Sequence, residues 1–351
     1  MYRYEDITTV HIEPTQLCNA ACPQCDRNQN GGWDNPYLTG ADLTLADYHK
    51  IFPASFIRQL KTIFMCGNLG DPCVSKDSLE AFRYFRGINP RVWLSMNTNG
   101  GARDEEYWAE LAKVFGMTGA VIFSIDGLED TNHLYRQKVN WNSVMRNAKA
   151  FINAGGRARW DFIVFKHNEH QVEEAQQLSN DMGFETFQFK KTGRFFSTVK
   201  HKGKESHQAV NKKGELTQKL EKPKDKYVNK ALHKEKELVA KHGSMDNYYK
   251  KVKIDCKVKK EKSIFITAEG MLMPCCWVGG QMYKWYWPPK HSDVWPFIDK
   301  QDLDVKTNSL KDVMNGPFLK AIENSWQDES RPKVCANKCG VEFDAFGEQF
   351  T

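Results

Sequence analysis

Short apolar runs alternate with amphipathic stretches through the first 190 residues of the chain. The apolar runs are rich in β-branched and aromatic residues, and each has the length of a single strand. Six strands are predicted, over Thr8–Glu13, Thr62–Cys66, Val92–Asn97, Ala120–Ile125, Trp160–Phe165 and Thr186–Lys190. Five helices are predicted between them, over Leu43–Phe52, Asp77–Phe85, Glu105–Phe115, Trp141–Ala154 and His170–Met182, the last with Asn168 as its cap.

The alternation of strands and helices predicts an α/β fold with a parallel sheet built from right-handed βαβ units. The apolar runs show little alternation, which is typical of strands covered on both faces. An open doubly wound sheet and a partial barrel both satisfy this pattern. In both architectures, ligands bind at the carboxyl ends of the strands.

The rest of the chain has a different pattern. Residues 196–255 are rich in lysine and are predicted to form a mainly helical insertion or linker, with Glu215–Gly243 as a solvated helix broken near Pro223. Beyond Cys256, the apolar runs in SIFITAEGMLMPCC predict a β-hairpin. A helix is predicted over Ser309–Asn324. We therefore expect three parts, over residues 1–195, 196–255 and 256–351.

The composition limits the class of protein. A hydrophobic content of 40% over 351 residues supports a packed core and excludes a disordered chain. The N-terminus has no signal-peptide pattern, and no apolar run is long enough to span a membrane. Ten cysteines without a secretion signal favour a reducing compartment, so we expect a cytoplasmic protein whose clustered cysteines bind metal or do redox chemistry.

The positive charge is concentrated in one segment. Residues 190–262 carry 23 Lys and Arg against 9 Asp and Glu, whereas the remainder carries 27 against 35. Such a segment can bind nucleic acid or an acidic partner through its lysines. A solvated helical insertion of mixed charge explains the same pattern, because the acidic residues are interspersed among the lysines.

Three cysteines lie directly after the first predicted strand, in the stretch LCNAACPQCDR. Cys18, Cys22 and Cys25 would therefore sit at the carboxyl end of the sheet. Four thiolates normally hold a four-iron cluster, so three leave one iron open to a further ligand. A structural zinc knot or a reduced surface loop remains as the alternative.

The spacing C-x3-C-x2-C resembles the signature of the radical S-adenosylmethionine (SAM) superfamily. Supporting segments follow the next four predicted strands in the family's order: CGNLGDPC, MNTNGG, FSIDGLEDTNHLYR and FKHNEHQVEE, with Asp71 in place of the usual Glu. The resemblance implies a partial (β/α)6 TIM-like barrel with a [4Fe–4S] cluster on the three cysteines. It also implies reductive cleavage of SAM at the open iron to a 5′-deoxyadenosyl radical, which abstracts hydrogen from a substrate.

The resemblance further implies a set of SAM contacts at the strand ends. The glycines allow close approach of the backbone to SAM, Asp71 suits the methionyl ammonium, and Arg136 pairs with the carboxylate through its planar fork. Plain turns and a surface ion pair are the alternatives for these positions. The residues implied are Gln24, Gly67, Gly70, Asp71, Asn99, Ser124 and Arg136.

A second group of cysteines comprises Cys256, Cys275, Cys335 and Cys339. Four thiolates make a saturated site for an iron–sulfur cluster or zinc. The spacing of the first two around Gly270 resembles the start of the SPASM/Twitch extension of radical SAM enzymes. That resemblance implies one auxiliary [4Fe–4S] cluster. Cys276 could replace Cys275 as the ligand, but the spacing favours Cys275. The remaining Cys66 and Cys73 are expected to be small buried side chains.

These features predict a radical SAM enzyme that acts on a peptide or a small polar substrate. We expect an electron donor such as flavodoxin or ferredoxin as its partner, and no membrane. The aromatic stretch Trp277–Trp295 is either a substrate wall or ordinary packing. The alternative function is a non-catalytic or zinc-binding relative whose lysine-rich segment binds nucleic acid.

Overall fold

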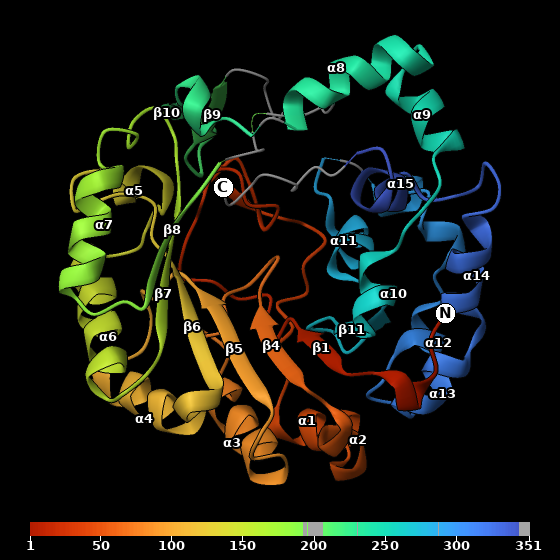
Figure 1. Cartoon of the computed structure of the whole chain (residues 1–351), viewed down its shortest axis with the longest axis horizontal. Coiled ribbons are helices and arrows are strands. Elements are labelled where there is room, and N and C mark those ends of the chain that lie inside the picture. Colours follow the sequence, from red (N-terminus) through yellow and green to blue (C-terminus); the bar gives the residue numbers. More distant parts are fainter. Residues whose placement is uncertain (192–194, 196–205, 230, 287, 344–351) are drawn as a thin grey trace.

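Six parallel strands form the centre of one eight-stranded sheet in the computed structural model, which describes residues 1–191, 195, 206–229, 231–286 and 288–343. The sheet curves into an open partial barrel with helices on its outer side (Figure 1). The six strands are β1 (Thr9–Ile12), β4 (Thr62–Cys66), β5 (Trp93–Thr98), β6 (Gly119–Ser124), β7 (Ala158–Ile163) and β8 (Thr186–Lys190). They confirm the six predicted strands and the α/β class.

The predicted C-terminal hairpin is confirmed, and it extends the barrel sheet. Its strands are β11 (Ser263–Ile266) and β12 (Leu272–Met273), which pair antiparallel. β11 also pairs in parallel with β1, so Val10 lies opposite Ile264 on one side and Ile63 of β4 on the other. The sheet order is therefore β12-β11-β1-β4-β5-β6-β7-β8, and it does not close within the described residues.

The two faces of the sheet differ in polarity. On β5, Leu94 and Met96 are fully buried under the outer helices, whereas Ser95 and Asn97 face the concave side and are half-buried. The alternation follows from the strand period of two. The helices of the barrel are α1 (Leu45–Ile51), α2 (Ala54–Gln59), α3 (Ser78–Ile88), α4 (Glu105–Phe115), α5 (Asn132–Tyr135), α6 (Trp141–Asn153) and α7 (Val172–Asp181).

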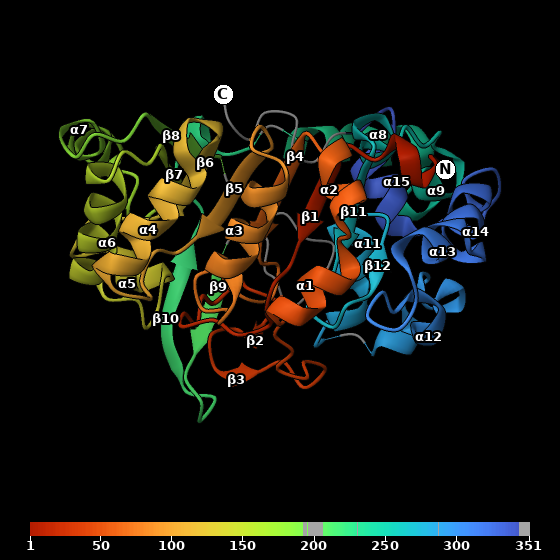
Figure 2. The same ribbon diagram turned by 90° about the horizontal axis from the view of Figure 1, so that it is seen from below.

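The chain after residue 205 covers the mouth and one side of the barrel. Two short hairpins, β2 (Asn28–Gln29) with β3 (Trp33–Asp34) and β9 (Ser206–Val210) with β10 (Leu216–Glu221), lie side by side (Figure 2). The remaining helices are α8 (Ala231–His242), α9 (Met245–Lys251), α10 (Lys257–Glu261), α11 (Cys276–Gly279), α12 (Lys300–Leu303), α13 (Leu310–Asn315), α14 (Pro317–Ser325) and α15 (Lys333–Cys339). Among the described helices, none combines the length and apolar composition that a membrane span requires.

Three local predictions were wrong. The helix expected from Glu215 begins instead as strand β10, because this lysine-rich stretch pairs with β9. Asn168 does not cap α7, whose N-cap residue is Gln171. The Asn168 side chain is buried and bonds to the backbone of Phe165, Asp126 and Ile163. The helix predicted over 309–324 is divided into α13 and α14 at Gly316-Pro317.

Replacing Ile264 by Ala tests whether the C-terminal hairpin belongs to the cooperative unit of the barrel. Ile264 is 1% exposed, so its truncation should cost about 2–5 kcal/mol of unfolding free energy. Leu216→Ala on β10 is the control, because Leu216 is 61% exposed and should cost less than about 0.5 kcal/mol. Urea unfolding followed by tryptophan fluorescence and circular dichroism measures both. A separate transition for the C-terminal part in the Ile264 variant would contradict a shared unit.

Candidate functional site

The loop after β1 brings the first three cysteines together at the mouth of the barrel. Cys22 is buried, and Cys18 and Cys25 are half-buried. Each sulfur meets a polar group of the chain. The backbone N–H of Ala20 donates to Cys18 Sγ at 3.3 Å, and the thiol of Cys25 lies 3.8 Å from the carbonyl oxygen of Asn68. Burial raises the pKa of the Cys18 thiol, and Asp71 and the other two cysteines add to the increase.

These thiols are a chemically suitable donor set for an iron–sulfur cluster. All ten cysteines are free, so none of the three is committed to a disulfide. Across the described ranges, no three or more His, Cys, Asp or Glu side chains are arranged to hold a single metal ion. A four-iron cluster takes its thiolates on separate iron atoms, which places the ligands further apart than around one ion.

Gly67 and Gly70 are required by close contacts between backbone segments. A Cβ on Gly67 would lie 1.8 Å from the carbonyl oxygen of Gly70. A Cβ on Gly70 would lie 1.9 Å from the carbonyl oxygen of Thr15, in the segment that leads into the cysteine loop. The N–H of Asp71 donates to the carbonyl of Leu17 at 2.8 Å. The backbone of the loop after β4 therefore packs directly against the loop that carries the cysteines.

The Asp71 carboxylate is buried and faces the loop after β5. It accepts hydrogen bonds from the hydroxyl of Thr98 at 2.7 Å, and from the backbone and side-chain N–H groups of Asn99 at 2.7 and 2.6 Å. The Asn99 amide also donates to Cys18 Sγ at 3.8 Å. Asp71 thus orients Asn99 toward the cysteine loop, and its own oxygens are occupied by protein donors.

Glu13 was not identified from the sequence. It lies directly after β1, is 2% exposed, and accepts hydrogen bonds from the N–H groups of Leu69 at 2.5 Å and Gly70 at 3.4 Å. Burial raises the pKa of Glu13 from 4.5 to about 7, although these hydrogen bonds oppose the increase. An isolated acidic residue at the end of an apolar strand was the one available signal.

Arg136 lies between a buried carboxylate and the cysteine loop. Its Nε donates to Asp126 at 2.6 Å, and its Nη1 lies 3.7 Å from Cys22 Sγ. Asp126 is fully buried and also accepts from the N–H of Ile163 at 2.6 Å. Burial lowers the pKa of Arg136, but Asp126 and Cys22 raise it by more, so the guanidinium stays charged. Of the two other predicted SAM contacts, Ser124 is half-buried at the end of β6, and Gln24 is buried and precedes Cys25 in the chain.

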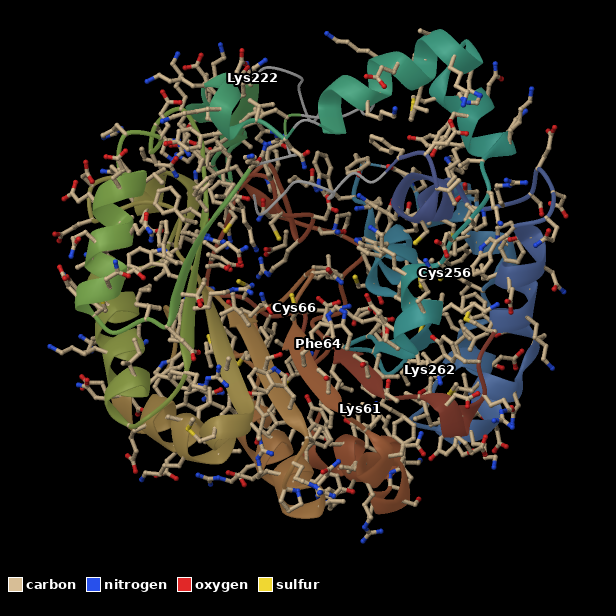
Figure 3. The ribbon with its side chains drawn as sticks, viewed as in Figure 1. Lys61, Phe64, Cys66, Lys222, Cys256 and Lys262 are labelled. Atoms are coloured by element: carbon tan, nitrogen blue, oxygen red, sulfur yellow. The ribbon has the colours of Figure 1, made fainter. Side chains whose placement is uncertain are left out.

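The concave face of the sheet carries a charged group that the sequence analysis missed. Asp161 on β7 is 1% exposed and forms ion pairs with Lys190 at 2.6 Å and Arg159 at 2.7 Å. The strand register places Ser124 opposite Asp161, and Cys66 opposite Asn97. Lys190 also acts electrostatically on Cys66. The sticks in Figure 3 show Cys66 at the centre of the molecule, at the end of β4.

The second four cysteines line one cavity at the opposite side of β1. Cys256, Cys275, Cys335 and Cys339 share its wall with apolar side chains, which include Ile254, Val278, Ile322 and Trp326. The Cys256 and Cys339 thiols interact with each other, which raises the pKa of Cys256 and lowers that of Cys339. Four thiols in an otherwise mainly apolar cavity are a suitable donor set for a saturated cluster or zinc.

Cys275 and Cys276 point to different sites. Cys275 has an extended backbone, with φ −158° and ψ 164°, so the next side chain leaves on the other side. Cys275 lines the four-cysteine cavity, whereas Cys276 interacts electrostatically with Cys66 and Glu13 at the barrel mouth. Of the other two spare cysteines, Cys73 is fully buried beside Thr98, in agreement with a packing role, and Cys66 is half-buried.

The segment after Cys276 and the β9–β10 hairpin both cover the cysteine loop. The side chain of Asn35 donates to the carbonyl of Tyr283 at 2.5 Å, and Lys284 forms an ion pair with Asp26, next to Cys25. On the other side, a ring nitrogen of His207 on β9 lies 3.0 Å from the carbonyl oxygen of Pro23. Parts of the chain more than 180 residues away thus enclose the loop.

Comparisons with known proteins identify the barrel. Residues 12–178 match the model of the radical SAM superfamily. Residues 12–178, just under half of the chain, therefore form a domain of this superfamily, and the match includes all three cysteines of the first loop. Comparison with curated protein sequences gives no significant match.

Solved structures with a similar fold include SuiB and anSMEcpe. SuiB from Streptococcus suis is 14% identical, with a TM-score of 0.55 over 91% of this chain and 68% of SuiB. SuiB has also been solved bound to the precursor peptide SuiA, with the same TM-score. The structure of anSMEcpe with bound AdoMet is 15% identical, with a TM-score of 0.51 over 90% of this chain and 79% of that one. At these identities the likeness is one of fold.

Replacing Glu13 by Gln tests the buried carboxylate. The substitution keeps an oxygen acceptor for Leu69 and Gly70 and removes the charge. Because the pKa of Glu13 is raised to about 7, its stabilising contribution is complete below 4.5 and is lost as the pH rises through 7.

We therefore expect wild type to lose up to about 3 kcal/mol relative to Glu13→Gln between about pH 5 and about pH 8. Urea midpoints in reducing buffer measure this difference. Exposed Glu106→Gln is the control and should follow wild type. If the unfolding free energies of wild type and Glu13→Gln changed with pH in the same way, the Glu13 carboxylate would not be the source of the pH dependence.

Proposed function

We propose that the chain is a radical SAM enzyme with two iron–sulfur sites. Cys18, Cys22 and Cys25 hold a [4Fe–4S] cluster that binds SAM, and the second four cysteines hold one auxiliary [4Fe–4S] cluster. When bound and reduced, the first cluster and SAM supply a 5′-deoxyadenosyl radical that abstracts hydrogen from the substrate. The observation that carries this proposal is the convergence of the three thiols at the mouth of a barrel that matches the superfamily.

The surrounding residues have distinct tasks in this proposal. Asn99 and Arg136 direct N–H groups at the sulfur atoms of Cys18 and Cys22 and so orient these two side chains. Glu13 and the Gly67–Asp71 loop fix the position of the cysteine loop. Backbone atoms of Gly67 and Gly70, with the side chains of Gln24, Asn99, Ser124 and Arg136, are proposed to meet SAM, and Asp71 to orient Asn99 there.

The substrate is proposed to be a peptide or a small polar molecule that enters the concave side of the barrel. The polar groups on this face, Asp161, Lys190 and Ser124, lie at the strand ends where ligands of such barrels bind. Structures of similar fold have been solved with the precursor peptide SuiA and with a Cp18Cys peptide. The enclosing segments 277–284 and 206–221 are proposed to exclude water from the reaction.

The decisive experiment is production of 5′-deoxyadenosine from SAM by anaerobically reconstituted protein, with dithionite as reductant. Cys22→Ala should abolish the product, because it removes one of only three ligands of the SAM-binding cluster. The matched control is Cys276→Ala, which removes a thiol outside both proposed ligand sets and should retain product formation. Product from the Cys22 variant would contradict the ligand assignment, and zinc instead of iron in the purified protein would favour the zinc-binding alternative.

Cys275→Ala and Cys276→Ala separate the two candidate ligands of the auxiliary site. Because Cys275 lines the four-cysteine cavity and Cys276 does not, we expect Cys275→Ala to lose about half of the bound iron. Cys276→Ala should retain the wild-type iron content. Iron analysis and electron paramagnetic resonance of the reduced proteins measure both. The reverse pattern would make Cys276 the ligand.

A further inference from the structure

A dense group of lysines surrounds the Cys256 side of the auxiliary site. Residues 250–262, KKVKIDCKVKKEK, contain seven lysines and two acidic residues, with Cys256 at their centre. Cys256 is the N-cap residue of α10 and Lys262 is its C-cap residue, and Figure 3 labels both. Six of the seven lysines are exposed, and five of them define what we call the basic collar: Lys251, Lys253, Lys259, Lys260 and Lys262. The sixth, Lys250, pairs with Glu329.

The collar retains positive charge after its internal ion pairs are formed. Lys259 pairs with Glu323, and Lys260 pairs with Asp255. Lys251, Lys253 and Lys262 have no carboxylate within ion-pair distance among the described residues. Exposed cations that lack an internal partner attract an oppositely charged surface and speed its approach.

The four-cysteine site comes close to the surface inside this collar. A second, open pocket adjoins the cavity and shares Ile254, Cys256 and Trp326 with it. Lys259 and Lys260 form part of the rim of this pocket together with their ion-pair partners Glu323 and Asp255, so the unpaired positive charge comes from the other three lysines of the collar. A small apolar centre with a charged rim is the anatomy of a protein–protein interface. The backbone from Lys253 to Asp255 is held to the Cys339–Val341 segment by hydrogen bonds, so the collar is fixed to two of the cysteine positions.

We propose that the basic collar is the docking surface for an acidic one-electron carrier protein that delivers its electron at the four-cysteine site. This inference rests on the proposed function, because it requires a cluster on those cysteines. In the step, the reduced carrier loses one electron and the four-cysteine site gains it, with no bond made or broken. Encounters of this kind use small, charge-steered interfaces.

The chemistry of the collar favours a protein partner over nucleic acid. All seven cations of residues 250–262 are lysines, whereas arginine is preferred where phosphate is bound by a planar fork. The proposed redox site lies directly under the collar. Electron transfer to this site requires a redox carrier, and a nucleic acid does not supply one.

The test compares two charge-reversal variants of equal net charge. The collar variant is Lys251→Glu/Lys253→Glu/Lys262→Glu. The matched control is Lys50→Glu/Lys76→Glu/Lys149→Glu, three exposed lysines on the barrel side of the molecule. Each reconstituted protein is mixed anaerobically with reduced flavodoxin or with dithionite, and cluster bleaching is followed by stopped flow at low and high salt. Steady-state 5′-deoxyadenosine formation is measured with each reductant.

We expect the collar variant to be reduced by flavodoxin at least about tenfold more slowly than wild type at low salt, with a weaker salt dependence. Its reduction by dithionite and its dithionite-driven product formation should equal those of wild type and the control variant. Equal flavodoxin rates for the collar and control variants would overturn the inference. Wild-type reduction by flavodoxin that does not depend on salt would overturn it too.

Two further outcomes have distinct meanings. If the collar variant loses affinity for a single-stranded RNA oligonucleotide and keeps the wild-type flavodoxin rate, the surface belongs to nucleic acid and the inference is wrong. If no protein forms 5′-deoxyadenosine with dithionite, the proposed function fails before the collar is tested by activity. The flavodoxin rates of cluster bleaching still decide the docking question in that case.

Discussion

Two buried carboxylates hold the mouth of the barrel together. Glu13, after β1, binds the backbone of the loop after β4, and Asp71 of that loop binds the loop after β5. The close backbone contacts at Gly67 and Gly70 leave no space for a side chain at either position. The position of the cysteine loop is therefore determined by its neighbours, because the loop has little regular structure of its own. Every proposed ligand and SAM contact at this end of the barrel depends on this bracing.

The strands and the place of the first site were predictable from the sequence. Parallel strands end at one edge, so motifs that follow Ile12, Cys66 and Thr98 had to meet there, whatever the details of the loops. The roles of Glu13 and Asp161 were not predictable, because a single acidic residue in an apolar strand has no distinctive spacing. Their partners depend on the register between strands that are far apart in sequence.

The placement of the C-terminal part also depends on long-range pairing. The β-hairpin over 263–273 was evident from its local pattern, but its position beside β1 is set by contacts between Val10 and Ile264. Strand β10 was missed because the lysines and glutamates in and around it favour a helix, and its pairing with β9 outweighs that preference. Asn168 was misread for a similar reason: its buried hydrogen bonds to the β6 and β7 ends replace a cap.

The side chains of Cys275 and Cys276 point to opposite sides of the backbone, so one peptide unit lies between the four-cysteine cavity and the mouth of the barrel. The four-cysteine cavity lies on one side, and Cys66 and Glu13 lie on the other. Cys276 interacts electrostatically with Cys66 and Glu13 on one side and with Cys275 on the other, in buried surroundings that screen charge poorly. The occupancy and charge of the two sides are therefore interdependent without any hinge or moving part. Exchanging the C-terminal part for that of a relative would also replace β11 and β12, two of the eight strands of the barrel sheet.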